Sequence, residues 1–412
     1  MAQPYPHLLS PLQCGKFIFK HRMQSSNSVP HFSQGPEKYP ADPTIAHFLG
    51  RAKSGAAFVT LAGFEDSVNA PQFPDTLDMS HFPEFDLRNA LCQNYMVELI
   101  EAMHYEGTLV SGSLFSATKT FRYENEKGEV EIIDANPPID MTLGATSMII
   151  QQTGDEVSAE DLVKIAKSYG QKTAFYKRLG FDAVTLHMSY RAQLPGQLLS
   201  PLSNKRTDEF GGSFENRCRF TMETVDAIRS VVGPNFPITY RISLDHRFPG
   251  GRTLEESMKI LDVLDKCGID AFDIDAACYE TMDYIFPTRY TGEACMAYVC
   301  EEARKHLTKP IINTGNHSME SAVDLLKSGN ADIVQFGRQS IADPQFANKL
   351  REGRREDVRP CIVCNEECIG RIFGRLTQLS CTVNPSVGFE SYMEVKPVSG
   401  PTNVVVIGGG PG

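Results

Sequence analysis

The chain has no sustained run of basic residues, no long apolar run and no charged start followed by an apolar block. Its 40 Lys and Arg against 51 Asp and Glu give a net charge of −11, which offers no overall attraction to phosphate backbones or anionic lipid. No apolar stretch reaches the roughly 18 residues that a membrane span needs. We therefore expect neither nucleic-acid nor membrane binding, and a soluble cytoplasmic protein.

The composition is that of a globular protein. Hydrophobic residues make up 41% of the 412 residues and charged residues 22%, which excludes a disordered or fibrous chain. At roughly 150 residues per domain, this length predicts two or three domains.

The 11 cysteines are an odd number and fit poorly with complete disulfide pairing. Seven are scattered, as small buried side chains in a reducing compartment usually are. Four lie together at Cys361, Cys364, Cys368 and Cys381. Thiolates at this spacing can close around Zn²⁺ or an iron–sulfur cluster. Because only one pair has the CxxC form, the spacing favours a cluster over zinc, and either over free thiols.

Short β-branched runs alternate with amphipathic stretches over most of the chain. Such alternation predicts parallel strands joined by right-handed crossovers, an α/β architecture. Eight candidate strands favour a (β/α)8 barrel with long loops, although the count leaves a doubly wound sheet open. We expect strands at residues 23–28, 57–61, 108–112, 183–187, 238–243, 271–274, 310–314 and 333–336, and helices at 160–179, 216–232, 254–267 and 319–328. Residues 116–141 are expected to form a long excursion after the third strand.

Polar residues and glycines follow several of these strands. Glycine turns at residues 314–316 and 336–338 follow the last two strands, and their N–H groups with the Arg338 guanidinium predict a phosphate site. His187 ends another strand, where a barrel places its active-site loops. A lone histidine at a strand end is more often structural than catalytic.

The end of the chain has a different character. An apolar run at residues 403–407 leads into Gly408 and Gly410, which is typical of the opening of a dinucleotide-binding βαβ unit. The helix that would hold the pyrophosphate is absent, and residues 402–412 alone are too few to bind a dinucleotide. We therefore expect the sequence to stop inside a further, Rossmann-type domain.

Four groups of residues together carry a family resemblance. They are Leu9-Ser-Pro-Leu with Lys20-His-Arg22, Leu199-Ser-Pro with residues 204–217, Gly337-Arg338 with Ala342-Asp-Pro344, and the four clustered cysteines. Over essentially its whole length the chain resembles the Old Yellow Enzyme family. The resemblance is closest to the iron–sulfur branch of that family, the 2,4-dienoyl-CoA, 2-enoate and bile-acid-inducible enone reductases.

The resemblance implies three parts. An FMN-binding barrel is expected at residues 1–350 and an iron–sulfur segment with a [4Fe-4S] cluster at 351–398. Residues 402–412 are expected to be the first strand and glycine turn of a truncated FAD/NAD(P)-binding domain. In such enzymes electrons pass from NAD(P)H through FAD and the cluster to FMN, so FAD and NAD(P)H belong to the missing C-terminal region.

The resemblance also assigns roles to single residues. Arg241 is expected beside the flavin pyrimidine edge, where a fixed cation stabilises the reduced anion by about 2–4 kcal/mol. Cys361, Cys364, Cys368 and Cys381 match the cluster ligands. The remaining flavin contacts are expected at Ser26, Asn27, Ser28, Ala62, Ser113 (in place of the family's usual Gln), Gly315, Asn316, Gly337 and Arg338.

Residues 187–190 differ from the family pattern at the substrate. His187-Met-Ser-Tyr190 replaces the His-x-x-His/Asn pair that polarises the substrate carbonyl, and Ala192 replaces the Tyr that often donates a proton. We predict that His187 and Tyr190 bind the carbonyl oxygen and that Tyr190 or a nearby group supplies the proton. In the alternative, Tyr190 packs against its loop and the proton comes from solvent.

The expected function is that of a flavin-dependent ene-reductase, which transfers hydride to the C=C bond of an α,β-unsaturated carbonyl compound such as an enoate, enoyl thioester or steroid-like enone. An alternative is oxidative demethylation of the trimethylamine-dehydrogenase type. It is disfavoured because covalent FMN in that group uses a cysteine where this chain has Ser28-Val-Pro30. A third reading is a non-catalytic, zinc-stabilised barrel that binds a ligand or partner. The resemblance also favours a homo-oligomer.

Overall fold

A computed structural model gives the three-dimensional structure of the chain. It describes residues 5–14, 17–28, 40, 42–61, 89–114, 120–134, 139–144, 147–152, 157–188, 194–375, 377–393, 398–405 and 407–408.

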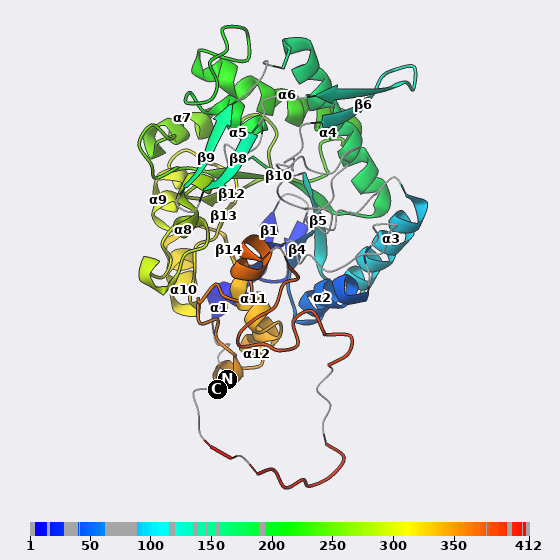
Figure 1. The fold of residues 1–412 in the computed structure, drawn as a ribbon, viewed down its shortest axis with the longest axis vertical. Helices are drawn as coiled ribbons and strands as arrows, with labels where there is room; N and C mark the ends of the chain where they lie inside the picture. The colour runs from blue at the N-terminus through cyan, green and yellow to red at the C-terminus, as the bar shows by residue number, and fades with distance from the viewer. Residues whose placement is uncertain are drawn as a thin grey trace.

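Eight parallel strands close into a barrel (Figure 1). The first strand of the barrel pairs with the last, which closes the sheet and excludes the doubly wound alternative. The predicted (β/α)8 barrel is therefore confirmed. In chain order the strands are β3 (Met23–Ser28), β4 (Phe58–Leu61), β5 (Leu109–Leu114), β10 (Ala183–His187), β11 (Ile238–Ser243), β12 (Ala271–Asp275), β13 (Ile311–Asn313) and β14 (Ile333–Gln335).

Helices surround the barrel, and their ends follow local sequence signals. The side chain of Ser158 caps the start of α4 by accepting from the backbone N–H of Asp161, and Gly180 ends that helix in a left-handed conformation. Gly170 lets α4 approach α6 closely, because a Cβ there would lie 2.7 Å from the Ala227 carbonyl oxygen. The longer helices are α2 (Asp42–Lys53), α3 (Ala90–Tyr105), α4 (Ala159–Leu179), α6 (Phe214–Val232), α7 (Leu254–Leu264), α9 (Tyr298–Arg304) and α10 (Met319–Ser328). The short ones are α1 (Pro6–Leu9), α5 (Leu194–Leu199), α8 (Met282–Ile285), α11 (Arg338–Ala342) and α12 (Phe346–Arg351), with the 3-10 turns η1 (Tyr279–Thr281), η2 (Arg289–Thr291) and η3 (Arg355–Asp357).

An N-terminal hairpin closes one end of the barrel. It is formed by β1 (Leu12–Cys14) and β2 (Phe17–Phe19), and its Phe19 packs against Phe58 with ring centroids 5.5 Å apart. Phe19 forms an apolar cluster with side chains at the beginnings of the barrel strands: Ala57, Phe58, Ala183, Ala271, Ile312 and Ile333. The N-terminal end of the barrel is therefore filled by apolar side chains, which leaves the opposite end for a site.

The excursion after the third barrel strand consists of two antiparallel hairpins, β6 (Thr120–Glu124) with β7 (Val130–Asp134) and β8 (Ile139–Gly144) with β9 (Ser147–Gln152). The predicted excursion is confirmed, and it continues further than residue 141. Strand β9 contacts η1, which follows β12, so the second hairpin reaches the loops at the carboxyl ends of the strands.

The cysteine-bearing segment folds beside the barrel with a small core of its own. Cys368, Ile372, Leu379 and Val387 pack there against Ile341 of α11, and η4 (Gly370–Gly374) is a single π-helical turn. The domain boundaries predicted from the sequence remain predictions.

The predicted strand at residues 403–407 is not seen in the described residues. Val404, Val405 and Ile407 are 78%, 82% and 97% exposed, and the described part of the chain supplies no strand for them to pair with. Within the same described ranges, no helix is both long enough and apolar enough to cross a membrane.

Candidate active site at the carboxyl ends of the barrel strands

The interior of the barrel changes from apolar to polar along the strands. Alternate residues of a strand face the same side. The residue two positions after a strand residue of the Phe19 cluster therefore also faces the barrel interior. The Ser111 and Thr185 hydroxyl oxygens lie 2.9 Å apart, and the Gln335 amide donates to Asp273 at 2.9 Å although β12 and β14 are not neighbours. These buried polar residues are Thr60, Ser111, Thr185, Thr239, Asp273 and Gln335. A polar interior at this end indicates a binding site rather than a packed core.

The next inward position of β11 holds Arg241, whose guanidinium pairs with Asp275 of β12. Both Nε and Nη2 of Arg241 donate to Oδ2 of Asp275, at 3.2 and 2.8 Å. His187 of β10 lies in register with Arg241, and Ser113 of β5 lies in register with Thr185. The structure thus brings the predicted residues Ser113, His187 and Arg241 to one end of the barrel. Asp275 was missed by sequence reasoning, although its place two residues after an inward aspartate could have indicated it.

Asp273 is a buried carboxyl group beneath this ion pair. Burial, with a smaller contribution from nearby Asp275, raises the pKa of Asp273 to about 6, although Arg241 and the Gln335 hydrogen bond act to lower it. Among the described residues, Oδ1 of Asp273 and Oε1 of Gln335 are buried without a hydrogen-bond partner. Buried polar atoms of this kind are costly unless a ligand or water satisfies them.

The two predicted phosphate turns lie side by side. Gly315 has φ +129°, and a Cβ there would lie 2.8 Å from Met296 Cβ. A Cβ at Gly337 would lie 2.5 Å from Ser26 Oγ, so the turn after β14 closely approaches the end of β3. Asn316 Oδ1 accepts from Arg338 at 3.5 Å, which joins the two turns. The predicted residues Ser26, Gly315, Asn316, Gly337 and Arg338 are therefore neighbours.

Arg338 is a partly buried cation at these turns. In the described part of the chain, it has no carboxylate partner, and partial burial lowers the pKa of its guanidinium. Its Nη1 donates to the Pro287 carbonyl at 2.5 Å and to Asn365 Oδ1 at 2.6 Å, while Nε has no acceptor among the described residues. Removing a guanidinium from water in part, without a counter-charge, costs free energy, so this position suits an anion such as a flavin phosphate.

Four of the predicted flavin and substrate contacts fall wholly or partly outside the described residues. Ala62 and Tyr190 lie outside the described residues, as do the side chains of Asn27 and Ser28. The joint role of His187 and Tyr190 at a substrate carbonyl therefore stays a prediction.

The four clustered cysteines are free thiols near Arg338. Burial raises the pKa of the Cys368 thiol to about 11, with Cys361 and Cys364 also raising it. Among the described residues, however, no three His, Cys, Asp or Glu side chains are arranged to hold a metal ion. Cysteine thiols are suitable ligands for iron or zinc, but these four are not arranged around a common metal position in the described residues. The set of cluster ligands therefore stays a prediction.

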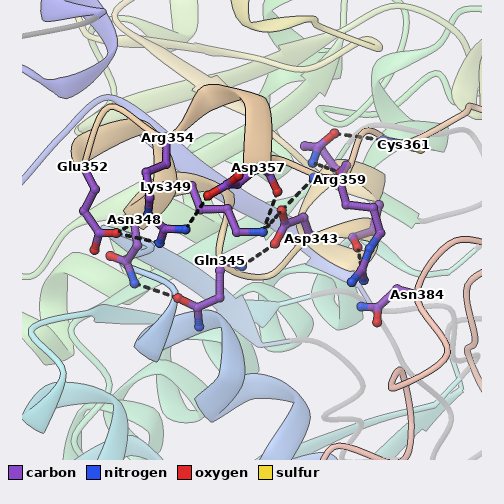
Figure 2. Close-up of polar contacts among 12 residues, drawn as sticks. Asp343, Gln345, Asn348, Lys349, Glu352, Arg354, Asp357, Arg359, Cys361 and Asn384 are labelled. Atoms are coloured by element: carbon purple, nitrogen blue, oxygen red, sulfur yellow. Dashed lines mark hydrogen bonds and ion pairs between the residues drawn. The ribbon is translucent and has the colours of Figure 1, made fainter. Parts of the chain in front are cut away.

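Polar contacts fasten the cysteine segment to the barrel (Figure 2). Asp343 lies at their centre: its carboxylate accepts from Lys349 Nζ at 2.7 Å and from the backbone N–H of Arg359 at 2.9 Å. The side-chain oxygen of Gln339 accepts from the N–H of Cys361 at 3.0 Å, and its nitrogen donates to the Arg359 carbonyl at 3.0 Å. Gln339 and Asp343 were not singled out from the sequence, although Asp343 belongs to a quoted motif.

The most specific motif of the sequence, residues 204–217, has a structural role. Asn204 donates to the carbonyls of Leu198 and Phe210 at 2.7 and 2.8 Å. Arg206 binds Asp208 and the Val157 carbonyl, and a Cβ at Gly211 would lie 2.3 Å from the Arg206 carbonyl oxygen. These contacts hold the loop between α5 and α6 in place.

A family model described as NADH:flavin oxidoreductase / NADH oxidase matches residues 7–357. The chain belongs to this family. The flavin oxidoreductase family accounts for the barrel with its polar carboxyl end and confirms the resemblance that the sequence motifs indicated. FMN is the cofactor that membership supports.

Among curated proteins, the chain is 30% identical to an NADH oxidase of Thermoanaerobacter brockii over 99% of this chain and 60% of that protein. It is 26% identical to a cinnamate reductase of Clostridium sporogenes, covering 100% of this chain and 62% of that protein. A dimethylamine dehydrogenase of a Hyphomicrobium species is also 26% identical, over 98% of this chain and 54% of that protein.

Among solved structures, a 2-naphthoyl-CoA reductase complex superimposes with a TM-score of 0.80 at 24% identity, over 94% of this chain and 58% of that one, which supports the fold. The chain thus spans about 60% of the length of the curated relatives.

Proposed function

We propose that this chain binds FMN at the carboxyl ends of the barrel strands and serves as the hydride-transferring part of an ene-reductase that acts on α,β-unsaturated carbonyl compounds. The observation that carries the proposal is the pairing of Arg241 with Asp275 at the same barrel end as the partly buried guanidinium of Arg338, which has no carboxylate partner among the described residues. Arg241 offers a fixed cation for a flavin ring, and Arg338 offers a cation for the flavin phosphate. The relative named cinnamate reductase supports a C=C bond as the target, because cinnamate is an unsaturated carboxylate.

When bound, FMN would supply the hydride. Arg338 and the N–H groups after Gly315 and Gly337 would bind the phosphate. Asp275 would hold Arg241 at the ring edge, where its charge favours the anionic, reduced state. His187 would donate a hydrogen bond to the substrate carbonyl oxygen and so stabilise negative charge developing there; Tyr190 or solvent would supply the proton.

We further propose that Cys361, Cys364, Cys368 and Cys381 hold a [4Fe-4S] cluster that delivers electrons. The support is four free thiols of suitable spacing, fastened beside the phosphate turn by Gln339 and Asp343. FAD and NAD(P)H would bind parts of the enzyme outside these residues. The division at residues 1–350, 351–398 and 402–412, and a homo-oligomeric state, belong to the same proposal.

A second candidate is oxidation of a methylated amine. It is favoured by the match to dimethylamine dehydrogenase, which is as identical to this chain as the cinnamate reductase is. Against it stands the absence of a cysteine at Ser28-Val-Pro30, where that group attaches its flavin.

The test is anaerobic reconstitution of the chain with FMN, iron and sulfide. Bound flavin and iron are measured, and then turnover of cinnamate with a chemical reductant is compared with turnover of dimethylamine with an electron acceptor. His187→Ala should lower cinnamate reduction by about 10²–10³-fold, as expected for loss of one oxyanion donor, whereas the exposed His7→Ala should not. A folded chain that retains no FMN would overturn the proposal, and faster dimethylamine oxidation would favour the second candidate.

A further inference from the structure

The guanidinium of Arg338 is oriented by a residue of the cysteine segment. Asn365 Oδ1 accepts from Nη1 of Arg338 at 2.6 Å. Asn365 Nδ2 donates to the Phe286 carbonyl at 2.7 Å, so both ends of its amide are engaged and its orientation is set. The second hydrogen of Nη1 goes to the neighbouring Pro287 carbonyl at 2.5 Å. One amide therefore fixes Arg338 relative to the loop after β12.

The backbone at Asn365 makes this contact available. Asn365 has φ +61°, a left-handed conformation that asparagine tolerates better than most residues, in the turn between Cys364 and Cys368. Its carbonyl accepts from the N–H of Gly370 at 2.8 Å, which ties the turn to η4. Phe373 of η4 packs on Phe286 with ring centroids 5.1 Å apart. The amide thus lies at the junction of three segments: the phosphate turn, the loop after β12 and the cysteine turn.

The remaining donors of Arg338 face elsewhere. Among the described residues, Nη2 makes only a long contact, 3.5 Å, to Asn316 Oδ1, and Nε has no acceptor. If Nη1 is held by Asn365 and Pro287, Nε and Nη2 are the edge left for an anion at the two glycine turns. A planar guanidinium presents this edge bidentately only when its rotation is restricted.

We infer that Asn365 is a positioning residue for the flavin phosphate: by orienting Arg338 it makes FMN affinity depend on the cysteine turn, and FMN in return stabilises that turn. This inference rests on the proposed function. The reciprocity follows from linkage, since two events that share one oriented side chain must favour each other equally.

Two variants separate orientation from charge. Asn365→Gly suits the left-handed backbone and removes the amide without adding charge. Asn365→Asp keeps the shape, adds a carboxylate that competes with phosphate for Arg338, and replaces the N–H facing the Phe286 carbonyl with an oxygen. Asn94→Asp, exposed on α3, adds the same charge far from the site and is the matched control.

The experiment measures the FMN dissociation constant of the metal-free chain by flavin fluorescence, with a thermal melt to confirm folding. We expect the dissociation constant to rise about tenfold in Asn365→Asp, as for loss of one charged hydrogen bond. It should rise a few-fold in Asn365→Gly and stay unchanged in Asn94→Asp. Hydrogen exchange of residues 361–375 should slow on FMN addition in the wild type and in Asn94→Asp, and not in Asn365→Gly.

The inference is overturned if both Asn365 variants bind FMN as tightly as Asn94→Asp and FMN still protects residues 361–375 in Asn365→Gly. In that outcome the proposed function stands, because the wild type binds flavin. A wild-type chain that is folded and binds no FMN would overturn both.

Discussion

At the scale of single residues, the site depends on polar groups that an ordinary barrel core would exclude. Asp273 is 2% exposed, and its neighbours Arg241, Asp275 and Gln335 come from three different strands. Burying a carboxyl group with one cation shared between two acids costs free energy in the empty protein. Such costs are typical of binding sites, where a ligand satisfies the groups that folding leaves strained or unpaired.

The raised pKa of the buried Asp273 carboxyl group predicts how the free energy of unfolding depends on pH. The pKa of Asp273 is about 6, above its unfolded value near 3.9, so the native state binds this proton more tightly. The stabilisation from that proton is present below about pH 4 and is lost as pH rises through 6. It amounts to roughly 3 kcal/mol at about 1.4 kcal/mol per pH unit. We expect Asp273→Asn to gain about this much free energy of unfolding over the wild type between pH 4 and pH 7, measured by urea unfolding. The exposed Asp283→Asn should show no such trend.

A second residue-scale prediction concerns the close approach at the phosphate turn. Gly337→Ala places a Cβ 2.5 Å from Ser26 Oγ and should lower the free energy of unfolding by about 1–3 kcal/mol, as overpacking does. In a Ser26→Ala background the same Cβ lies 3.7 Å from the Cβ of residue 26, so most of the loss should disappear. A double-mutant cycle by chemical denaturation measures this coupling; equal losses in both backgrounds would contradict the contact.

At the scale of elements, the two ends of the barrel differ in kind. The N-terminal end is sealed by the β1–β2 hairpin, whereas the carboxyl end carries the turns, the excursion hairpins and the cysteine segment. Strand alternation alone puts apolar and polar layers on the same inward face of each strand. The hairpin therefore stabilises the scaffold without touching the site.

The hairpin offers a matched pair of substitutions. Phe19 is 8% exposed and packs on Phe58, whereas its neighbour Ile18 is 68% exposed. Phe19→Ala should lower the free energy of unfolding by about 3–5 kcal/mol, and Ile18→Ala by less than about 0.5 kcal/mol. Thermal or urea unfolding provides the comparison. If both substitutions cost the same, the hairpin does not seal the barrel.

At the scale of the whole molecule, ligand binding at the carboxyl ends of the strands should stabilise the entire barrel against unfolding. The phosphate turns follow β13 and β14, and β14 pairs with β3 to close the barrel. A ligand held there joins the last strands to the first, so local opening at the site becomes coupled to barrel opening.

Ligand-dependent melting tests this coupling and the role of the phosphate. At 100 times its dissociation constant, FMN should stabilise the chain by about 2.7 kcal/mol and raise the melting temperature. Riboflavin at the same concentration should raise it far less, because the Arg338 guanidinium has no phosphate to bind. In Arg338→Ala the difference between the two ligands should shrink, leaving only the contribution of the backbone N–H groups of the turns. Equal effects of FMN and riboflavin on the wild-type chain would show that the turns do not bind phosphate.

The amino-acid sequence by itself determined the scaffold. Strand and helix periodicity, serine caps and glycine stops are local signals, so all eight barrel strands were predicted close to their observed bounds. Glycine turns and strand-end residues such as His187 also follow from local order, because parallel strands bring their carboxyl ends together. The apolar run at residues 403–407 shows the limit of local signals, since no strand in the described residues pairs with it.

Only the tertiary structure decided which of these residues act together. Gln335 and Asp273 lie 62 positions apart and Asn365 lies 27 positions from Arg338, and both pairs meet only after the barrel closes and the cysteine segment docks. The pKa of Asp273 and the orientation of Arg338 depend on burial and on partners from distant segments. No pattern along the chain specifies these, because burial and hydrogen bonding are properties of the packed molecule.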